Sequence, residues 1–206
     1  MDSLWFLGIS TVTASLGLAW GDPNAERSPH SLTWPWGRQM ASQLHICLQN
    51  VMSEGLTWDH CAGVAVAVGP GSFTGSRLGV TVARTLGQTL GIPVYGFSAL
   101  AALAHSSGLD PVAVRLDAKR GEWIGGVYER QGSQILAQIP EHLWSEAQWQ
   151  DLVTSLGIPA LTLSDDSAAD VLAASLVMLG REALTEGRES PWWQVVPNYS
   201  RQPPIG

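Results

Sequence analysis

The stretch Gly69-Pro70-Gly71-Ser72-Phe73-Thr74-Gly75 separates a segment with a strand pattern from a segment with a helix pattern, and the prediction of the fold starts from it. Before it, Gly63–Val68 is a continuous run of β-branched residues and alanine, which is typical of a buried central strand. After it, a helical pattern extends to about Leu90 and ends at Gly91 and Pro93, the usual order of helix-terminating residues. A strand, a glycine-rich turn and a helix N-terminus together present backbone N–H groups that suit an anion.

The glycine loop, residues 69–75, does not fit the common nucleotide-binding fingerprints. The Walker pattern needs Gly-Lys where the chain has Thr74-Gly75, and the Rossmann pattern needs glycine in place of Thr74. Two interpretations therefore stay open from the residues alone. The loop is a phosphate-binding turn of unusual sequence, or it is a tight strand-to-helix connection in which Ser72 or Thr74 caps the helix.

The helix after the glycine loop has too little polar surface for an ordinary surface helix. Its polar arc, defined by Arg77, Arg84 and Gln88, is only about 40° wide at 100° per residue. Small residues recur every four positions and permit close approach of another backbone. They are Gly75, Gly79, Ala83 and Gly87. Either the chain itself surrounds this helix, or a partner shares it.

Outward from this centre, the pattern predicts alternating strands and helices. Strands are expected at Leu4–Gly8, Ser15–Trp20, Val94–Phe97, Val112–Leu116, Trp123–Tyr128 and Ile135–Ile139, and helices at 38–53, Ser98–His105, 142–153 and 168–186. The polar, proline-containing stretch Gly21–Gly37 is expected to be a loop, and 197–206 an extended tail.

Composition excludes several classes of protein. The chain has 206 residues, 45% of them hydrophobic, which excludes intrinsic disorder, and no apolar run approaches the length of a membrane helix. The net charge is −7, so the chain lacks the basic surface that holds a nucleic-acid backbone. Two cysteines form no disulfide framework, and the N-terminus lacks the basic region of a secretory signal, so a cytoplasmic location is expected.

Four motifs in the same order as in the TsaB (YeaZ) family give the chain its resemblance to that family. The glycine loop continues as Ser76-Arg77-Leu78-Gly79, in the family pattern GPGSFTG-x-R-x-G. It is followed by Ile92-Pro93-Val94 with Ser98-Ala99-Leu100, by the turn Asp117-Ala118-Lys119-Arg120-Gly121-Glu122, and by Pro197-Asn198-Tyr199-Ser200-Arg201. These motifs cover most of 60–130 and the C-terminus, whereas 21–60 and 131–190 are similar only in outline.

The resemblance implies an α/β chain of the actin-like ATPase fold, with two ribonuclease-H-like lobes built on mixed sheets. The composition changes near residue 100, so we expect an N-terminal lobe at 1–100 and a shortened second lobe with a tail at 101–206. The resemblance further implies a non-catalytic subunit that dimerises with the paralogue TsaD and acts with the ATPase TsaE. That complex makes threonylcarbamoyladenosine beside the anticodon of tRNA, and this chain would touch tRNA only through the complex.

By the same resemblance, the partner interface lies on the first two helices. The residues expected there are Met40, Leu44, Leu48, Gly75, Arg77, Leu78, Gly79, Thr81, Val82, Ala83 and Leu86. The turn residues Asp117, Lys119, Arg120 and Glu122 are expected to have a structural or partner role.

One departure from the family concerns chemistry. Family members begin with a strand that leads into an Asp-Thr-Ser-like turn, and alignment by Ser15–Leu18 places Gly8 where that Asp stands. No catalytic residue is therefore assigned, and the five histidines show no metal-ligand spacing. The alternatives are an ATPase that uses the glycine loop and Asp117, and a homodimer through the same helices; ATP or ADP at the partner interface stays open.

Overall fold

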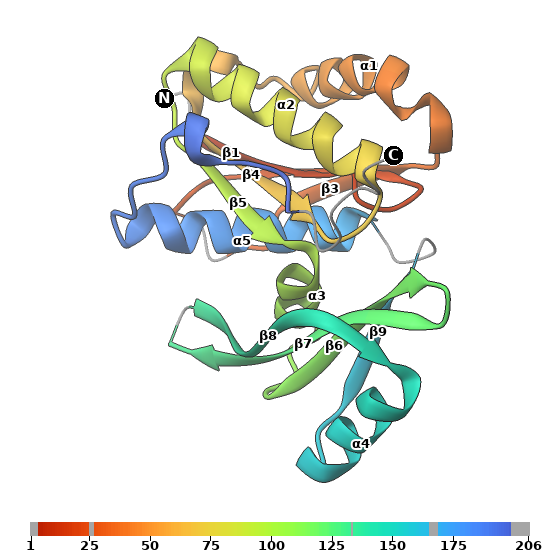
Figure 1. Cartoon of the computed structure of the whole chain (residues 1–206). Coiled ribbons are helices and arrows are strands. Elements are labelled where there is room, and N and C mark those ends of the chain that lie inside the picture. The colour runs from red at the N-terminus through yellow and green to blue at the C-terminus, as the bar shows by residue number, and fades with distance from the viewer. Residues whose placement is uncertain (1–3, 25–26, 133, 165–168, 199–206) are drawn as a thin grey trace.

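The computed structural model describes residues 4–24, 27–132, 134–164 and 169–198 as two sheets with helix α3 between them (Figure 1). The first sheet has the strand order β3-β2-β1-β4-β5. Its strands are β1 (Trp5–Ser10), β2 (Leu16–Gly21), β3 (His30–Trp34), β4 (Cys61–Gly69) and β5 (Val94–Ser98). Of its four pairings, β1–β2 and β2–β3 are antiparallel and β1–β4 and β4–β5 are parallel, so the expected mixed sheet is confirmed.

Helices cover both faces of the first sheet. Helices α1 (Met40–Met52) and α2 (Phe73–Leu90) lie on one face, and α5 (Ala169–Thr185) lies on the other (Figure 1). Successive residues of a strand point to opposite faces, so Leu7 packs in the cluster beneath α1 and α2 while Phe6 packs with α5. Coverage of both faces explains why β1 and β4 read as continuous apolar runs.

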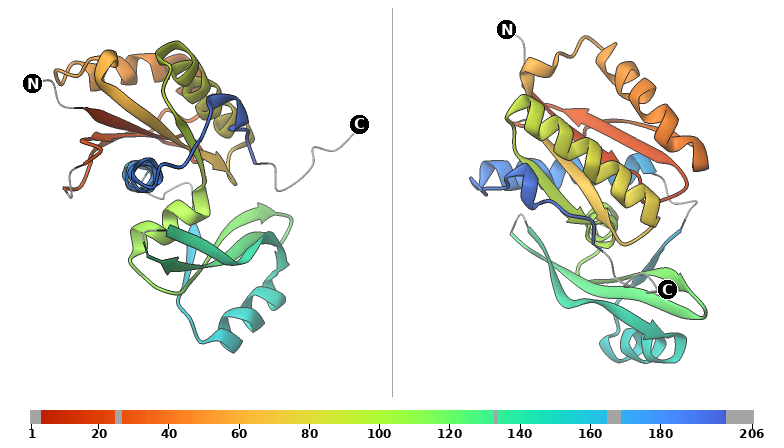
Figure 2. Two further views of the ribbon diagram at one scale, coloured as in Figure 1. Left: turned by 90° about the vertical axis from the view of Figure 1, so that its left-hand side faces the viewer. Right: turned by 45° about the horizontal axis from the view of Figure 1, so that its top comes forward.

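The second sheet has the order β8-β7-β6-β9. Its strands are β6 (Val112–Lys119), β7 (Glu122–Gln131), β8 (Gln134–Ser145) and β9 (Ala160–Leu163). Helix α4 (Glu146–Leu156) packs on its outer face, and α3 (Ala99–Ser107) lies between the two sheets (Figure 2). Short 3-10 turns are η1 (Gly37–Gln39), η2 (Trp58–His60) and η3 (Trp192–Gln194).

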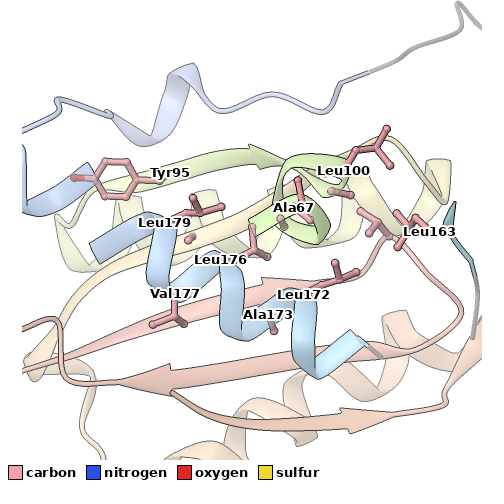
Figure 3. Packing of buried hydrophobic residues seen from close by; sticks show 14 of the residues in the cluster. Ala67, Tyr95, Leu100, Leu163, Leu172, Ala173, Leu176, Val177 and Leu179 are labelled. Carbon is pink, nitrogen blue, oxygen red and sulfur yellow. The ribbon is translucent and has the colours of Figure 1, made fainter. Parts of the chain in front are cut away.

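One hydrophobic cluster joins the two lobes. It contains residues of α5, of α3 and of both sheets, among them Ala67, Leu100 and Leu163. Figure 3 shows the side chains of α5 lying among those of β4, β5, α3 and the end of β9. The α/β architecture with two lobes expected from the sequence is therefore the one observed, with α3 as the packing link between the lobes.

The observed elements differ from the expected ones at three places. Strand β3 lies inside the expected loop 21–37, because its residues pair with the edge of β2. Strand β8 continues to Ser145, so the helix expected at 142 begins at Glu146, where Ser145 and Gln148 form a capping box. Strand β9 was not expected; it pairs with β6 in parallel.

The C-terminal part of the chain returns to the first lobe. Although the expected boundary put 101–206 in a second lobe, α5 packs against β1, β2 and β4 of the first sheet. Two glycines permit this contact: a Cβ at Gly8 would lie 2.3 Å from the carbonyl oxygen of Ala173, and a Cβ at Gly17 would lie 1.9 Å from that of Ala169. The second sheet therefore spans 112–163 alone, and a single cut near residue 100 does not separate the lobes. Of the expected tail, residues 199–206 lie outside the described part of the chain.

Candidate functional site

The candidate site is a cleft between the two sheets with a volume of about 900 Å³. The first lobe lines it with the turn Thr11–Ala14, with Pro70–Ser76 and with Arg38, which lies in η1 just before α1. The second lobe lines it with Leu116–Lys119, Trp123 and the end of β9. The structure thus brings together the glycine loop and the first part of the turn, Asp117–Lys119, which lie about forty residues apart in the chain; Arg120 and Glu122 are not among the lining residues.

The glycine loop is held against the turn that follows β1. The N–H of Ser72 donates to the carbonyl oxygen of Val12 at 2.7 Å, and the hydroxyl of Thr11 donates to the carbonyl oxygen of Gly75 at 2.7 Å. A Cβ at Gly75 would lie 1.8 Å from the carbonyl oxygen of Thr11, so only glycine fits there. Gly71 has φ +153°, a conformation that other residues rarely adopt.

Ser72 is the N-cap of α2, because its hydroxyl accepts the N–H of Gly75 at 3.1 Å. Of the two N-caps proposed from the sequence, the structure therefore selects Ser72. The loop therefore fits the interpretation as a tight strand-to-helix connection, with Ser72 capping the helix and the backbone of the loop bonded to the β1–β2 turn. Anion binding by the remaining N–H groups stays a hypothesis.

Across the cleft, Asp117 organises its own turn. Its carboxylate accepts the backbone N–H of Lys119 at 2.7 Å and the ammonium group of Lys119 at 3.1 Å. These two contacts hold the pKa of Asp117 below its ordinary value. The turn is tight: Lys119, Arg120 and Gly121 have φ values of +67°, +61° and +77°. Asp117 therefore fits an Asx-turn role, which is structural.

The expected partner interface divides into a buried part and an outer part. Met40, Leu44, Gly75, Gly79 and Ala83 are buried in this chain's own core. A Cβ at Gly79 would lie 2.4 Å from the hydroxyl oxygen of Thr11. The small residues of α2 thus admit the chain's own β1–β2 turn and sheet, which favours the first of the two alternatives that the sequence left open, in which the chain itself surrounds this helix.

The outer part stays available to a partner. Leu48, Leu78, Val82 and Leu86 are half-buried, whereas Arg77 and Thr81 are exposed. Large apolar side chains extend this surface, with Phe73 44% exposed and Ile46 41% exposed. The guanidinium group of Arg77 lies 3.9 Å from the ring centroid of Phe73.

A shallow groove runs along the polar arc of α2. Its other side is formed by Trp192 and Pro197, which the sequence did not predict to lie there. Arg84 donates to the carbonyl oxygen of Val195 at 3.5 Å and lies 5.6 Å from the ring centroid of Trp192. The groove has a volume of about 380 Å³. No sequence pattern links α2 to a segment that lies more than a hundred residues later.

Groups with metal-binding or nucleophilic chemistry are not gathered at the cleft. In residues 4–24, 27–132, 134–164 and 169–198, no three His, Cys, Asp or Glu side chains are placed to hold a metal ion. Burial raises the pKa of Cys61 to about 12, so its thiol is not a ready nucleophile. None of the helices in the described residues has the length and apolar character that a membrane crossing requires.

Comparison with known proteins gives one family. A family model described as "TsaD: tRNA N6-adenosine threonylcarbamoyltransferase" matches residues 36–177. The TsaB protein of Bacillus subtilis (strain 168) is 35% identical over 109 residues, which are 51% of this chain and 47% of that protein. The TsaB protein of Escherichia coli (strain K12) is 28% identical over 63% of this chain and 57% of that protein. The matches thus span about half the length of these relatives.

Solved structures agree on the fold. A crystal structure from Pseudomonas aeruginosa, described as an uncharacterized protein with similarity to peptidase YeaZ, superposes with a TM-score of 0.74 at 24% identity. The alignment covers 98% of this chain and 100% of that one. A structure described as YeaZ from the same organism gives 0.72 at 22% identity, with 95% and 100% covered. Because the family model matches residues 36–177, the chain belongs to the family described as TsaD, and it is similar to proteins named TsaB and YeaZ.

Proposed function

We propose that the protein is a non-catalytic subunit in the biosynthesis of threonylcarbamoyladenosine in tRNA. It acts by binding a TsaD-type paralogue through the outer faces of α1 and α2. The names of the TsaB relatives support the pathway, and the net charge of −7 supports contact with tRNA only within a complex. TsaE joins this assembly as the separate ATPase.

The observation that carries the proposal is the apolar outer surface of α1 and α2. Phe73 on α2 and Ile46 on α1 are exposed, and Leu48, Val82 and Leu86 on the same two helices are half-buried. Exposed apolar side chains that lie together on neighbouring helices are typical of a protein–protein interface. The two helices lie side by side on one face of the first sheet, so a partner can contact both (Figures 1 and 2).

The absence of catalysis rests on Gly8. In the resemblance this position would carry the aspartate of an ATPase, and here the backbone of α5 fills the space next to it. A carboxylate at residue 8 would collide with the carbonyl oxygen of Ala173, so the packing of α5 leaves no room for that aspartate.

The experiment measures the affinity of the purified chain for the TsaD paralogue of the same source by titration calorimetry. Thr81→Arg places a long cation on the exposed outer face of α2 and is expected to weaken binding at least tenfold. Thr154→Arg makes the same change on α4 and serves as the matched control. Equal affinities for both variants and the unchanged protein would refute this interface, and no binding at all would refute the proposed partner.

A second candidate function is an ATPase of the same fold, favoured by the glycine loop and Asp117 lining one cleft. Its test is ATP turnover by the chain alone. Turnover that Asp117→Asn abolishes would establish it. Turnover at background, which the packing at Gly8 leads us to expect, would remove it.

A further inference from the structure

The carboxylate of Glu141 connects the second sheet to the end of the first. Glu141 lies on β8, and its Oε1 accepts a hydrogen bond from the hydroxyl of Ser98. The same oxygen accepts the hydroxyl of Tyr128, on β7, at 2.5 Å. Ser98 is the last residue of β5 in the first sheet and the N-cap of α3. One carboxylate oxygen thus joins both lobes and the helix between them.

A β-bulge directs Glu141 toward this position. On β7 and β8, Gly125 pairs with His142 and Val127 pairs with Ile139, so two residues of β8 lie opposite Gly126 alone. A Cβ at Gly126 would lie 2.8 Å from the carbonyl oxygen of Ile139, so glycine is required where the bulge bends inward. Bulges commonly re-aim one side chain in this way.

The donors of this network have defined directions. The hydroxyl oxygen of Ser98 accepts the N–H groups of Leu100 at 3.1 Å and Ala101 at 3.4 Å, so its own hydrogen is free to be donated to Glu141. Burial and the nearby Glu141 carboxylate raise the pKa of Tyr128, which keeps the phenol protonated as a donor. A negative charge beside the first turn of α3 is also favoured by the helix dipole.

The network is more polar than packing alone requires. Oε2 of Glu141 is buried and has no hydrogen-bond partner among the described residues. The surrounding interlobe cluster, which includes Ala99, Leu100 and Tyr128, is largely apolar. A buried polar atom without a partner costs stability, so an apolar residue would serve packing better.

Strand β8 is tied to the first lobe at a second point. The side-chain amide of Gln134 donates to the carboxylate of Glu186, just after α5, at 3.0 Å.

From these contacts we infer that Glu141 is a positioning residue that clamps the second sheet onto Ser98 and sets the width of the cleft. It thereby fixes the distance between the glycine loop and the Asp117–Lys119 segment. This inference rests on the packing of the lobes and does not depend on the proposed partner.

The test measures the distance between the lobes by pulsed electron paramagnetic resonance. Spin labels are attached at Thr85→Cys on α2 and Thr154→Cys on α4, both exposed, while the native Cys47 and Cys61 are buried. The labelled chain without these substitutions gives the background. We expect one narrow distance distribution, and in the Glu141→Ala variant a broader one with a shifted mean.

Two further variants separate clamping from general stability. Glu141→Gln keeps an oxygen that accepts both hydroxyl groups, so the narrow distribution should return. Glu129→Ala removes a carboxylate from the neighbouring strand β7 and should change nothing. An unchanged distribution in a folded Glu141→Ala variant would overturn the inference.

If Glu141→Ala fails to fold, Ser98→Gly decides, because it removes the hydroxyl of the first lobe that donates to Glu141, while glycine is tolerated at an N-cap. Broadening in Ser98→Gly supports the clamp, and an unchanged distribution overturns it.

Discussion

Gly8 shows how packing dictates the identity of a single residue. It lies in β1 with α5 directly against it, so the absence of a side chain is a packing requirement of this chain. The same absence removes the carboxylate that the resemblance leads one to expect there.

Replacing Gly8 by aspartate should destabilise the protein without creating an ATPase. The side chain would overlap the carbonyl oxygen of Ala173 and bury a charge, so we expect a loss of about 3 kcal/mol or more in the free energy of unfolding. Urea denaturation measures this loss, with Thr154→Asp on exposed α4 as the control. A Gly8→Asp variant of unchanged stability would contradict the packing described at α5.

His105 gives the chain an expected dependence of stability on pH. Burial, with a smaller contribution from Arg130, lowers the pKa of His105 to about 4 from the ordinary value of 6.5. Because the unfolded chain binds the proton more tightly, the free energy of unfolding should fall as pH drops from about 6.5 to about 4. We expect a loss of about 1–3 kcal/mol over this range.

The variant His105→Gln should flatten that part of the pH profile, whereas His45→Gln, on the exposed side of α1, should leave it in place. Denaturation midpoints between pH 7 and pH 4 provide the measurement. Parallel profiles for His105→Gln and the unchanged chain would show that another group is responsible.

At the scale of elements, α2 was predicted correctly in extent and only partly in its surroundings. The loop, the cap and the terminating Gly91 are local signals, and the structure confirms them. The stripe of small residues permits close approach but does not say by what. The neighbour is the chain's own β1–β2 turn, which no local pattern reveals.

Ala83→Leu tests this assignment. Ala83 is fully buried against this chain's core, so the added atoms should cost about 1–3 kcal/mol of stability before any partner is present. Thr81→Leu, two residues earlier on the exposed side, is the matched control and should leave the melting temperature nearly unchanged. Equal stability of the two variants would contradict the burial of Ala83 in this chain's core.

The turn Lys119–Gly121 stores strain that a substitution can release. Arg120 has φ +61°, a conformation that asparagine tolerates better than most residues. Arg120→Asn should therefore raise the free energy of unfolding by about 0.5–1 kcal/mol. A destabilised Arg120→Asn variant in thermal denaturation would indicate that the arginine side chain has a supporting contact.

Strands β3 and β9 and the end of β8 mark the limit of local signals. Strand β3 is an exposed edge strand whose formation depends on pairing with β2, and β9 is a short strand that depends on β6. Their sequences carry little periodicity of their own. Buried strands such as β4 were predictable because a strand that is buried on both faces consists of a continuous run of apolar residues.

At the scale of the whole molecule, the sequence did not predict which sheet α5 packs against. Its apolar pattern predicted a helix, and its packing on the first sheet depends on glycines 150 residues away in β1 and β2. As a result, the lobes share one core through α3 and α5 (Figures 1 and 3). The cleft is lined by residues of both lobes. The outer faces of α1 and α2 lie away from this core, which leaves them for a partner.

The most direct test of the central claim is hydrogen exchange of the chain with and without the TsaD paralogue of the same source, read by mass spectrometry. The proposal predicts slower exchange in peptides of α1 and α2 when the paralogue is present, with α4 unchanged. Identical exchange throughout, or protection confined to the second sheet and α4, would contradict binding through the outer faces of α1 and α2.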